Sequence, residues 1–199
     1  MAEKAGKTIT MKRILPGIFA LVFIVGCGAE YAIRRDYDFK KIKSVAVVDF
    51  SNTSVFGNSG NVIEDEFVYQ LLKAGFKVIE RSKVDLVLKE KGIASLSEND
   101  PELIKSIGRI LGVDAIITGT VSKYIADGKN TIYTTDNSGN VTAQVFLTEA
   151  EVDVSARMID VYTGEVVWSA KDSDKGFDIQ NAVSGAASGI IDSLAQLIK

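Results

Sequence analysis

The sequence predicts a single α/β domain, in which a mixed β-sheet is flanked by helices. Between residues 44 and 121, short apolar runs rich in β-branched residues alternate with segments whose apolar residues recur at helical spacing. From about 131 to 168 only strands and turns are predicted, and a long apolar helical face begins near residue 179. The first pattern is typical of parallel β-α-β pairing. The second adds an antiparallel meander to the same sheet.

The elements of the first part have recognisable ends. Asn61 is the expected N-cap of the first helix, with Glu64 three residues later as in a capping box, and Gly75 is expected to end it. Asp100 followed by Pro101 predicts another helix start. The predicted strands cover 44–50, 76–80 and 115–121, and the predicted helices cover 61–74, 82–92 and 101–111.

Turn signals divide the second part. Residues 136–140 and 160–165 are rich in Asp, Asn and Gly, which predicts two turns. Apolar residues alternate on odd positions through 141–147 and on even positions through 152–158. This change of parity predicts a β-bulge near Ala150.

The last helix carries two glycines, Gly185 and Gly189, beside its apolar face. A glycine weakens a helix but lets another element approach closely. We expect the helix to pack on its own sheet, and packing on a neighbouring subunit is the alternative.

Composition excludes several classes of function. The chain has 199 residues, a net charge of −3 and no histidine. No basic excess indicates nucleic-acid binding. Without histidine, the commonest general base and metal ligand are missing, so we expect neither an enzyme nor a metal or cofactor site. A single cysteine forms no internal disulfide.

The first 26 residues have the pattern of a signal peptide. Lys12 and Arg13 precede a mostly apolar stretch, 14–25, which is too short to span a membrane as a helix. Met11 is the expected true start. Removing 1–26, which carry a net charge of +3, takes the net charge from −3 to −6. Residues 27–43 are then expected to be a lipidated cysteine and a charged tether, and 44–199 the folded domain.

Residues 24–27, Ile-Val-Gly-Cys, resemble the lipobox of bacterial lipoproteins. The resemblance implies an acylated Cys27 as the first residue of the mature protein, with two or three acyl chains that make a stable membrane anchor. Gly28 follows in place of the aspartate that retains such proteins in the inner membrane. This favours the outer membrane of a Gram-negative bacterium, with the domain on the periplasmic side.

Four blocks of sequence resemble the CsgG family of curli production, assembly and transport lipoproteins. They are Val45–Phe50, Val78–Ser82, Leu111–Val121 and Ala156–Ser169, in the family's order. A similar domain occurs in the penicillin-binding-protein activator LpoB. The resemblance implies an α/β periplasmic domain behind a lipid anchor, over roughly residues 42–198.

Two features follow from this resemblance. The loop 51–60 lies where the curli ring has its constriction, so Val55, Phe56 and Asn58 are candidate peptide contacts; an ordinary strand-to-helix loop is the alternative. The curli protein also adds two amphipathic hairpins to a membrane pore. Here the matching segments, 123–142 and 169–176, place charges on both parities. We therefore expect the periplasmic domain without those membrane-spanning hairpins.

The sequence thus predicts an outer-membrane lipoprotein that acts as a non-enzymatic assembly or interaction module of the cell envelope. Its expected partners are the membrane, through the lipid on Cys27, and an envelope protein or further copies of itself. One alternative is an oligomeric curli-type secretion component. Another is an activator of a peptidoglycan synthase.

Overall fold

The computed structural model describes residues 28–52, 57–93 and 100–198. The signal-peptide prediction, Cys27, Val55 and Phe56 lie outside these residues. The elements in chain order are β1 (Glu30–Ile33), the 3-10 helix η1 (Phe39–Lys41), β2 (Ser44–Asn52), α1 (Ser59–Lys73), β3 (Lys77–Val78), α2 (Arg81–Glu90), α3 (Pro101–Leu111), β4 (Ala115–Thr135), β5 (Val141–Asp160), β6 (Val166–Gly176) and α4 (Ile179–Ile198).

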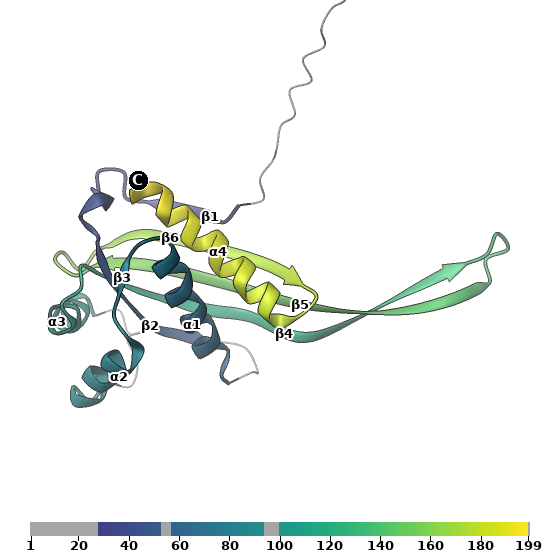
Figure 1. Cartoon of the computed structure of the whole chain (residues 1–199), viewed down its shortest axis with the longest axis horizontal. Helices are drawn as coiled ribbons and strands as arrows, with labels where there is room; N and C mark the ends of the chain where they lie inside the picture. Colours follow the sequence, from purple (N-terminus) through teal and green to yellow (C-terminus); the bar gives the residue numbers. More distant parts are fainter. Residues whose placement is uncertain (1–27, 53–56, 94–99, 199) are drawn as a thin grey trace, which may run out of the picture.

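The strands form one six-stranded sheet in the order β1-β6-β5-β4-β2-β3. β2 pairs in parallel with β3 and β4, and the other neighbours are antiparallel. Helices intervene between the parallel strands, because a parallel connection must cross from one end of the sheet to the other. The predicted fold class, a single α/β domain with a mixed sheet, is confirmed (Figure 1).

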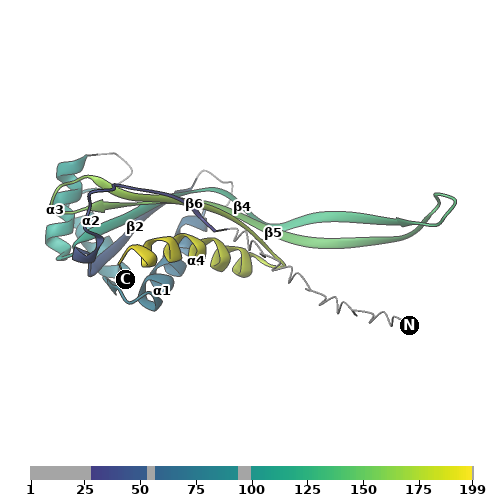
Figure 2. The same cartoon turned by 90° about the horizontal axis from the view of Figure 1, so that it is seen from above.

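The helices cover the sheet unequally. α1 and α4 lie side by side on one face and bury the larger core, which includes Phe67, Trp168 and Ile190. α2 and α3 lie at the end of the sheet remote from the long β4–β5 hairpin and bury a smaller core around Ile107 and Ile116 (Figures 1 and 2). Among the described residues, no helix lies on the rest of that second face (Figure 2). Among the described residues, no helix is both long and apolar enough to cross a membrane.

Most helix ends lie where the sequence predicted them. The Asp100 side chain accepts hydrogen bonds from the backbone of Glu102 and Leu103, and Gly112 ends α3 in the left-handed conformation. The N-cap prediction for Asn61 is wrong, because α1 already begins at Ser59. Its supposed capping partner Glu64 instead accepts a buried hydrogen bond of 2.9 Å from the Phe50 backbone N–H of β2.

The segment expected to be a tether is folded onto the domain. β1 pairs with β6 through four residues, from Glu30 opposite Lys171 to Ile33 opposite Trp168. Further along, Phe39 and Ile42 are buried in the larger core. Burial of these two side chains outweighs the polar character of the segment that contains them.

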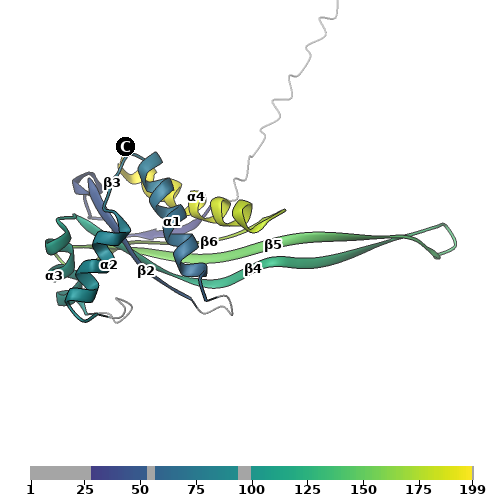
Figure 3. The ribbon, with the colours of Figure 1, turned by 60° about the horizontal axis from the view of Figure 1, so that its bottom comes forward.

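The β4–β5 hairpin is much longer than predicted. β4 and β5 have 21 and 20 residues, and their paired ends project beyond the rest of the molecule (Figures 1 and 3). The expected turn at 136–140 closes the hairpin: the Asp136 side chain accepts hydrogen bonds from the backbone of Ser138 and Asn140. We call residues 128–149 of this hairpin the arm.

The predicted bulge near Ala150 belongs to the partner strand. Ile125 pairs with Glu151 and Gly128 with Glu149, so two residues of β4 face Ala150 alone. β5 itself pairs regularly with β6 throughout this region. The change of parity in β5 is therefore not caused by a bulge in that strand. It means that the apolar side chains of β5 point to one face within the body of the sheet and to the opposite face within the arm.

The glycines of α4 allow close packing on the same chain, as expected. A β-carbon added to Gly185 would lie 1.5 Å from the Asp174 Oδ2, and one added to Gly189 would lie 2.1 Å from the Asp172 Oδ2. Both aspartates belong to β6, so α4 packs on its own sheet at these positions.

Candidate functional site: an N-terminal clasp and an open sheet face

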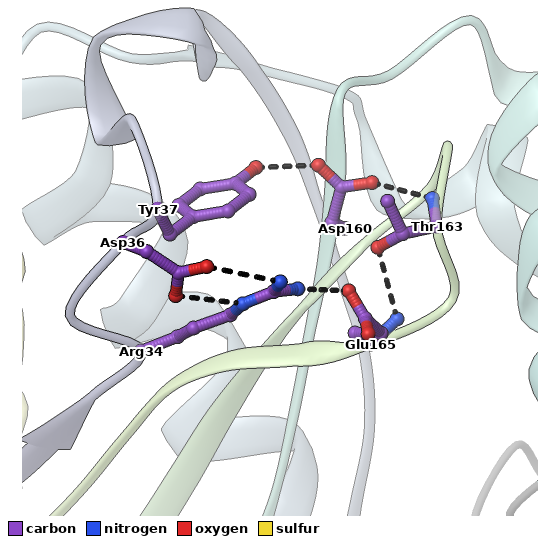
Figure 4. Close-up of polar contacts among 6 residues, drawn as sticks. All are labelled: Arg34, Asp36, Tyr37, Asp160, Thr163 and Glu165. Atoms are coloured by element: carbon purple, nitrogen blue, oxygen red, sulfur yellow. Dashed lines mark hydrogen bonds and ion pairs between the residues drawn. The ribbon is translucent and has the colours of Figure 1, made fainter.

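Six polar side chains join the segment after β1 to the turn between β5 and β6. We call this group the clasp; it consists of Arg34, Asp36 and Tyr37 from the first segment and Asp160, Thr163 and Glu165 from the turn (Figure 4). Asp160 and Gly164 form a tight backbone turn through a 2.8 Å hydrogen bond. Gly164 has a φ of +78°, which a residue with a side chain rarely adopts. The turn thus presents the carboxylates of Asp160 and Glu165 to the N-terminal segment, while the Thr163 hydroxyl accepts from the Glu165 backbone N–H within the turn.

The central contact of the clasp is between Tyr37 and Asp160. The Tyr37 hydroxyl donates to Asp160 Oδ2 at 2.5 Å, and the Thr163 backbone N–H donates to Oδ1 at 2.7 Å (Figure 4). Burial of the phenol, followed by the neighbouring Asp160 carboxylate, raises the pKa of Tyr37. Burial alone would raise the pKa of Asp160, but the hydrogen bonds from Tyr37 and Thr163 outweigh it and hold that pKa below its ordinary value.

Arg34 forms the outer, exposed part of the clasp. Its guanidinium donates to both oxygens of Asp36, at 3.0 and 3.3 Å, and forms an ion pair with Glu165 (Figure 4). Its backbone N–H also donates to the Val167 carbonyl at 2.9 Å, which continues the β1–β6 ladder. Exposed ion pairs contribute little stability. This part of the clasp therefore orients the N-terminal segment relative to the turn more than it stabilises the fold.

A cavity of about 520 Å³ lies beside the clasp and is lined in part by Arg109, Asp114 and Asp160. The carboxylates of Asp114 and Asp160 in its wall already accept hydrogen bonds from other parts of the domain. Asp114 Oδ2 accepts from the backbone N–H groups of Lys43 and Ser44 and from the Ser44 hydroxyl, at 2.9, 2.7 and 2.8 Å. These bonds outweigh burial and lower the pKa of Asp114. The cavity walls are therefore held by structural hydrogen bonds.

The pairing of β1 with β6 determines how far the domain lies from the predicted acylation site. Cys27 precedes Glu30, the first residue of β1, by three positions. Three extended residues span about 10 Å at most. A lipid on Cys27 would therefore sit directly beside the edge strand, with no long tether between membrane and domain.

The arm carries apolar side chains on one face. Ile132 pairs with Val145 across the two strands, and Leu147 lies two residues further along the same face. These three side chains are 49%, 45% and 45% exposed. At the base of the arm, Phe177 is 91% exposed and lines a cavity of about 440 Å³ together with Leu147. An isolated two-stranded hairpin is only marginally stable in water, so an apolar face on such a hairpin favours contact with a partner.

This apolar face continues the uncovered face of the sheet. Because β5 is regular, its odd-numbered residues share that face: Val145, Leu147, Glu149, Glu151, Asp153, Ser155 and Arg157. Three ion pairs cross its middle, Lys171–Glu30 at 2.9 Å, Lys123–Glu151 at 2.7 Å and Lys175–Glu149 at 3.4 Å. We call this surface the open face. It runs from the helices α2 and α3 to the tip of the arm (Figures 2 and 3).

Of the residues predicted to act, the structure describes only Asn58. It is exposed at the start of α1, where its side-chain oxygen accepts a 2.7 Å hydrogen bond from Asn61. With Val55, Phe56 and Cys27 outside the described residues, the peptide-contact loop and the lipidation site stay predictions. In the described part of the chain, no three acidic or cysteine side chains gather where they could hold a metal ion.

The clasp and the open face were missed from sequence. Their signals were present: Phe39 and Ile42 mark the supposed tether as folded, and the parity change in β5 marks the exposed apolar face.

The fold is that of an α/β domain in which α1 and α4 cover one face of the body of the sheet, while α2 and α3 cover only one end of the other face. The chain belongs to the CsgG family: the model of the curli production assembly/transport component CsgG matches residues 32–196. This confirms the resemblance seen in the four sequence blocks. The match begins inside β1, so the N-terminal segment that the clasp holds is part of the family domain.

Individual relatives are distant. The chain is 24% identical to a lipoprotein of Neisseria meningitidis serogroup B over 191 residues, which cover 94% of this chain and 80% of the relative. It is similar to the PelC dodecamer from Paraburkholderia phytofirmans, with a TM-score of 0.52, 17% identity and coverage of 84% of this chain and 98% of that chain. It is also similar to the LpoB C-terminal domain from Salmonella enterica, with a TM-score of 0.45, 16% identity and coverage of 69% of this chain and 98% of that chain.

Proposed function

We propose that this protein is a non-enzymatic lipoprotein, anchored to the outer membrane through an acylated Cys27, that holds a protein partner on the periplasmic side. The observation that carries the proposal is the exposed apolar face of the arm, formed by Ile132, Val145 and Leu147. Apolar side chains that gather on a projecting hairpin are typical of a surface that a partner covers.

The N-terminal geometry supports this role. A short connection to the lipid and a clasped N-terminal segment would hold the domain beside the membrane in a restricted set of orientations. The arm, as part of the same sheet, would then point in a restricted set of directions. An interaction module gains from this, because a partner bound to an oriented arm loses less freedom on binding.

Self-assembly is the second candidate, in which the protein is an oligomeric secretion component. The observation that favours it is the dodecameric state of the PelC structure, whose fold this chain shares. In this case the partner that covers the arm is another copy of the chain. The two candidates differ in the mass of the assembly.

The test is the mass of the natively acylated protein, extracted in mild detergent and measured by light scattering with the detergent subtracted. A large closed oligomer supports the secretion component, and a monomer or dimer supports the interaction module. Cys27→Ser is made in parallel, and we expect it to lose both the acyl mass and the membrane association. A Cys27→Ser protein that stays in the membrane fraction would contradict the anchor.

The arm is tested with a matched pair of variants. Ile132→Thr combined with Val145→Thr removes two of the three apolar side chains of this face, whereas Tyr133→Thr changes a more exposed residue on the opposite face of the same strand as Ile132. A photo-crosslinking residue at Leu147, which neither variant changes, should capture one defined species in cells, either a further copy or a distinct envelope protein. We expect the double variant to lose that species and Tyr133→Thr to keep it. Equal capture by both variants would overturn the role of the arm.

A further inference from the structure

A second feature of the open face lies on the body of the sheet, away from the arm. A cavity of about 330 Å³ opens there over the middle strands of the sheet. Its lining is almost wholly small and hydroxyl-bearing, with one cation: Ser51, Thr118, Thr120, Ser155, Ser169 and Arg157 are among the lining residues.

Arg157 occupies a central position in the sheet. On β5 it pairs with Thr118 of β4 on one side and with Ser169 of β6 on the other. The side chain is half-buried, and it takes part in no ion pair or hydrogen bond with the described residues. The next acidic residue on its face of β5 is Asp153, four positions away, or about 13 Å along a strand.

An unpaired guanidinium in such a place is unusual. Charged side chains are seldom buried without a partner, because partial removal of water from the charge costs free energy. The other three cations on the open face, Lys123, Lys171 and Lys175, each have a carboxylate partner at 2.7 to 3.4 Å. Arg157 therefore differs from its neighbours, and the cavity above it offers room for the missing anion.

The hydroxyl groups complete the site. Ser51 Oγ donates to the Gly119 carbonyl at 3.4 Å and lies 3.0 Å from Thr120 Oγ1. Either hydroxyl of this pair can donate to the other, and when Ser51 is the donor the hydrogen of Thr120 is available to a ligand. Ser155 precedes Arg157 by two residues on the same face, and its hydroxyl has no hydrogen bond to the described residues. A guanidinium provides a planar fork of N–H donors that matches the two oxygens of a carboxylate.

We propose that this cavity is a carboxylate-binding site in which Arg157 pairs with the carboxylate and the hydroxyls of Ser155 and Thr120 donate the remaining hydrogen bonds. A single cation balances one negative charge, which favours a carboxylate over a doubly charged phosphate. The carboxylate has two potential sources: an acidic side chain of a second copy of this acidic chain, or a small free acid such as a sugar acid. This inference is independent of the arm.

The experiment uses the acylated full-length protein in detergent, labelled with ¹⁵N only at arginine. The Nε–Hε signal of Arg157 is assigned as the one missing from Arg157→Gln. Sodium acetate and sodium glucuronate are added at constant ionic strength against sodium chloride. We expect a saturable shift of this signal with a dissociation constant of about 1–10 mM, and no matching shift of the Arg109 signal. Arg157→Lys keeps the charge but not the fork, and should bind at least several-fold more weakly in a thermal-shift titration that follows the single tryptophan, Trp168.

The two sources give different results. If a second copy supplies the carboxylate, the Arg157 signal shifts with protein concentration alone and acetate reverses the shift. If a free acid is the ligand, the signal responds to the added acid at every protein concentration. Either result supports the site. A signal that moves with neither, or that moves equally with chloride and phosphate, would overturn the proposal.

Discussion

Tyr37 and Asp160 are 123 residues apart in the chain, and a 2.5 Å hydrogen bond joins them. One side of this contact is the segment that follows the predicted lipidation site, and the other is the turn that connects β5 to β6. Tyr37 also packs edge-on against Phe39, with ring centroids 4.9 Å apart, so the same residue belongs to the clasp and borders the core.

Tyr37→Phe should destabilise the domain by about 1 kcal/mol, because it removes a hydrogen bond to a partly buried carboxylate while the ring is kept. Urea unfolding followed by the fluorescence of Trp168, which is buried, measures the change. Tyr31→Phe is the control, since Tyr31 is on the exposed edge strand β1. Equal losses of unfolding free energy in the two variants would contradict a specific contribution of the Tyr37–Asp160 hydrogen bond to stability.

Asp160 should make the domain sensitive to acid. Its pKa is lower in the folded protein than the ordinary 3.8, so its contribution to stability is complete above 3.8 and is lost as the pH falls through the folded value. We expect Asp160→Asn to be less stable than the parent at pH 6. The difference should shrink as the pH falls below 3.8. A constant difference from pH 6 to pH 2.5, measured by urea unfolding, would show that the carboxylate charge is not involved.

Asp172 should behave in the opposite way. Burial of its carboxyl against α4, with a smaller effect of Asp174, raises its pKa above 3.8 in the folded state. Folding therefore opposes its ionisation, and the domain gains relative stability as the pH falls through the raised value. Asp172→Asn should be more stable than the parent at pH 7, and the gain should vanish once the parent carboxyl is protonated. A variant that is less stable at pH 7 would contradict this.

Gly108 of α3 should not tolerate alanine unless Val161 is reduced as well. A β-carbon at Gly108 would lie 2.2 Å from a Val161 methyl carbon, and Val161 is buried. Overpacking of this kind costs about 1–3 kcal/mol, which exceeds the helix preference for alanine of up to about 1 kcal/mol. Gly108→Ala should destabilise, and Gly108→Ala with Val161→Ala should lose less than the sum of the single changes. Strict additivity in urea unfolding would rule out the contact.

The arm should be dispensable for folding. Replacement of residues 130–147 by Asn-Gly joins Lys129 to Thr148, which are already paired, through a two-residue hairpin turn. Since no described side chain of the removed part belongs to either core, the free energy of unfolding should change by less than about 1 kcal/mol. A loss of several kcal/mol would make the arm a structural element and not an interaction surface.

Local chemistry made some elements predictable from sequence. Asp100, Pro101 and Gly112 predicted α3 to within a residue at each end, because a cap, a fixed φ and a left-handed stop act within one turn. The parallel pairing of β2 and β4 followed from the helices between them. The prediction of Asn61 as the N-cap was wrong because the start of α1 depends on contact with β2. A β-carbon on Gly60 would lie 2.2 Å from the Phe50 carbonyl oxygen.

The candidate sites were less predictable because they depend on long-range pairing. Arg34 and Asp36 have the composition of a solvated tether, and only the arrival of Asp160 and Glu165 from the far end of the domain makes them part of a clasp. The long hairpin was not predicted because charged residues such as Lys129 and Glu149 interrupt the alternation of apolar residues. A hairpin in water can carry polar residues on both faces. The parity change near Ala150 was noticed, but without the register of β4 its meaning was open.

The position of β1 has a mechanical consequence. A load applied at Glu30 reaches the domain first through the four β1–β6 pairs, then through the clasp, and last through Phe39 and Ile42 in the core. These three attachments lie in series along 13 residues of chain. Under tension the edge strand β1 would detach first, which lengthens the connection between the membrane and the domain. The remaining five strands would stay paired with one another. The N-terminal segment is thus short in the resting protein, and under tension it can detach and extend before the rest of the domain unfolds.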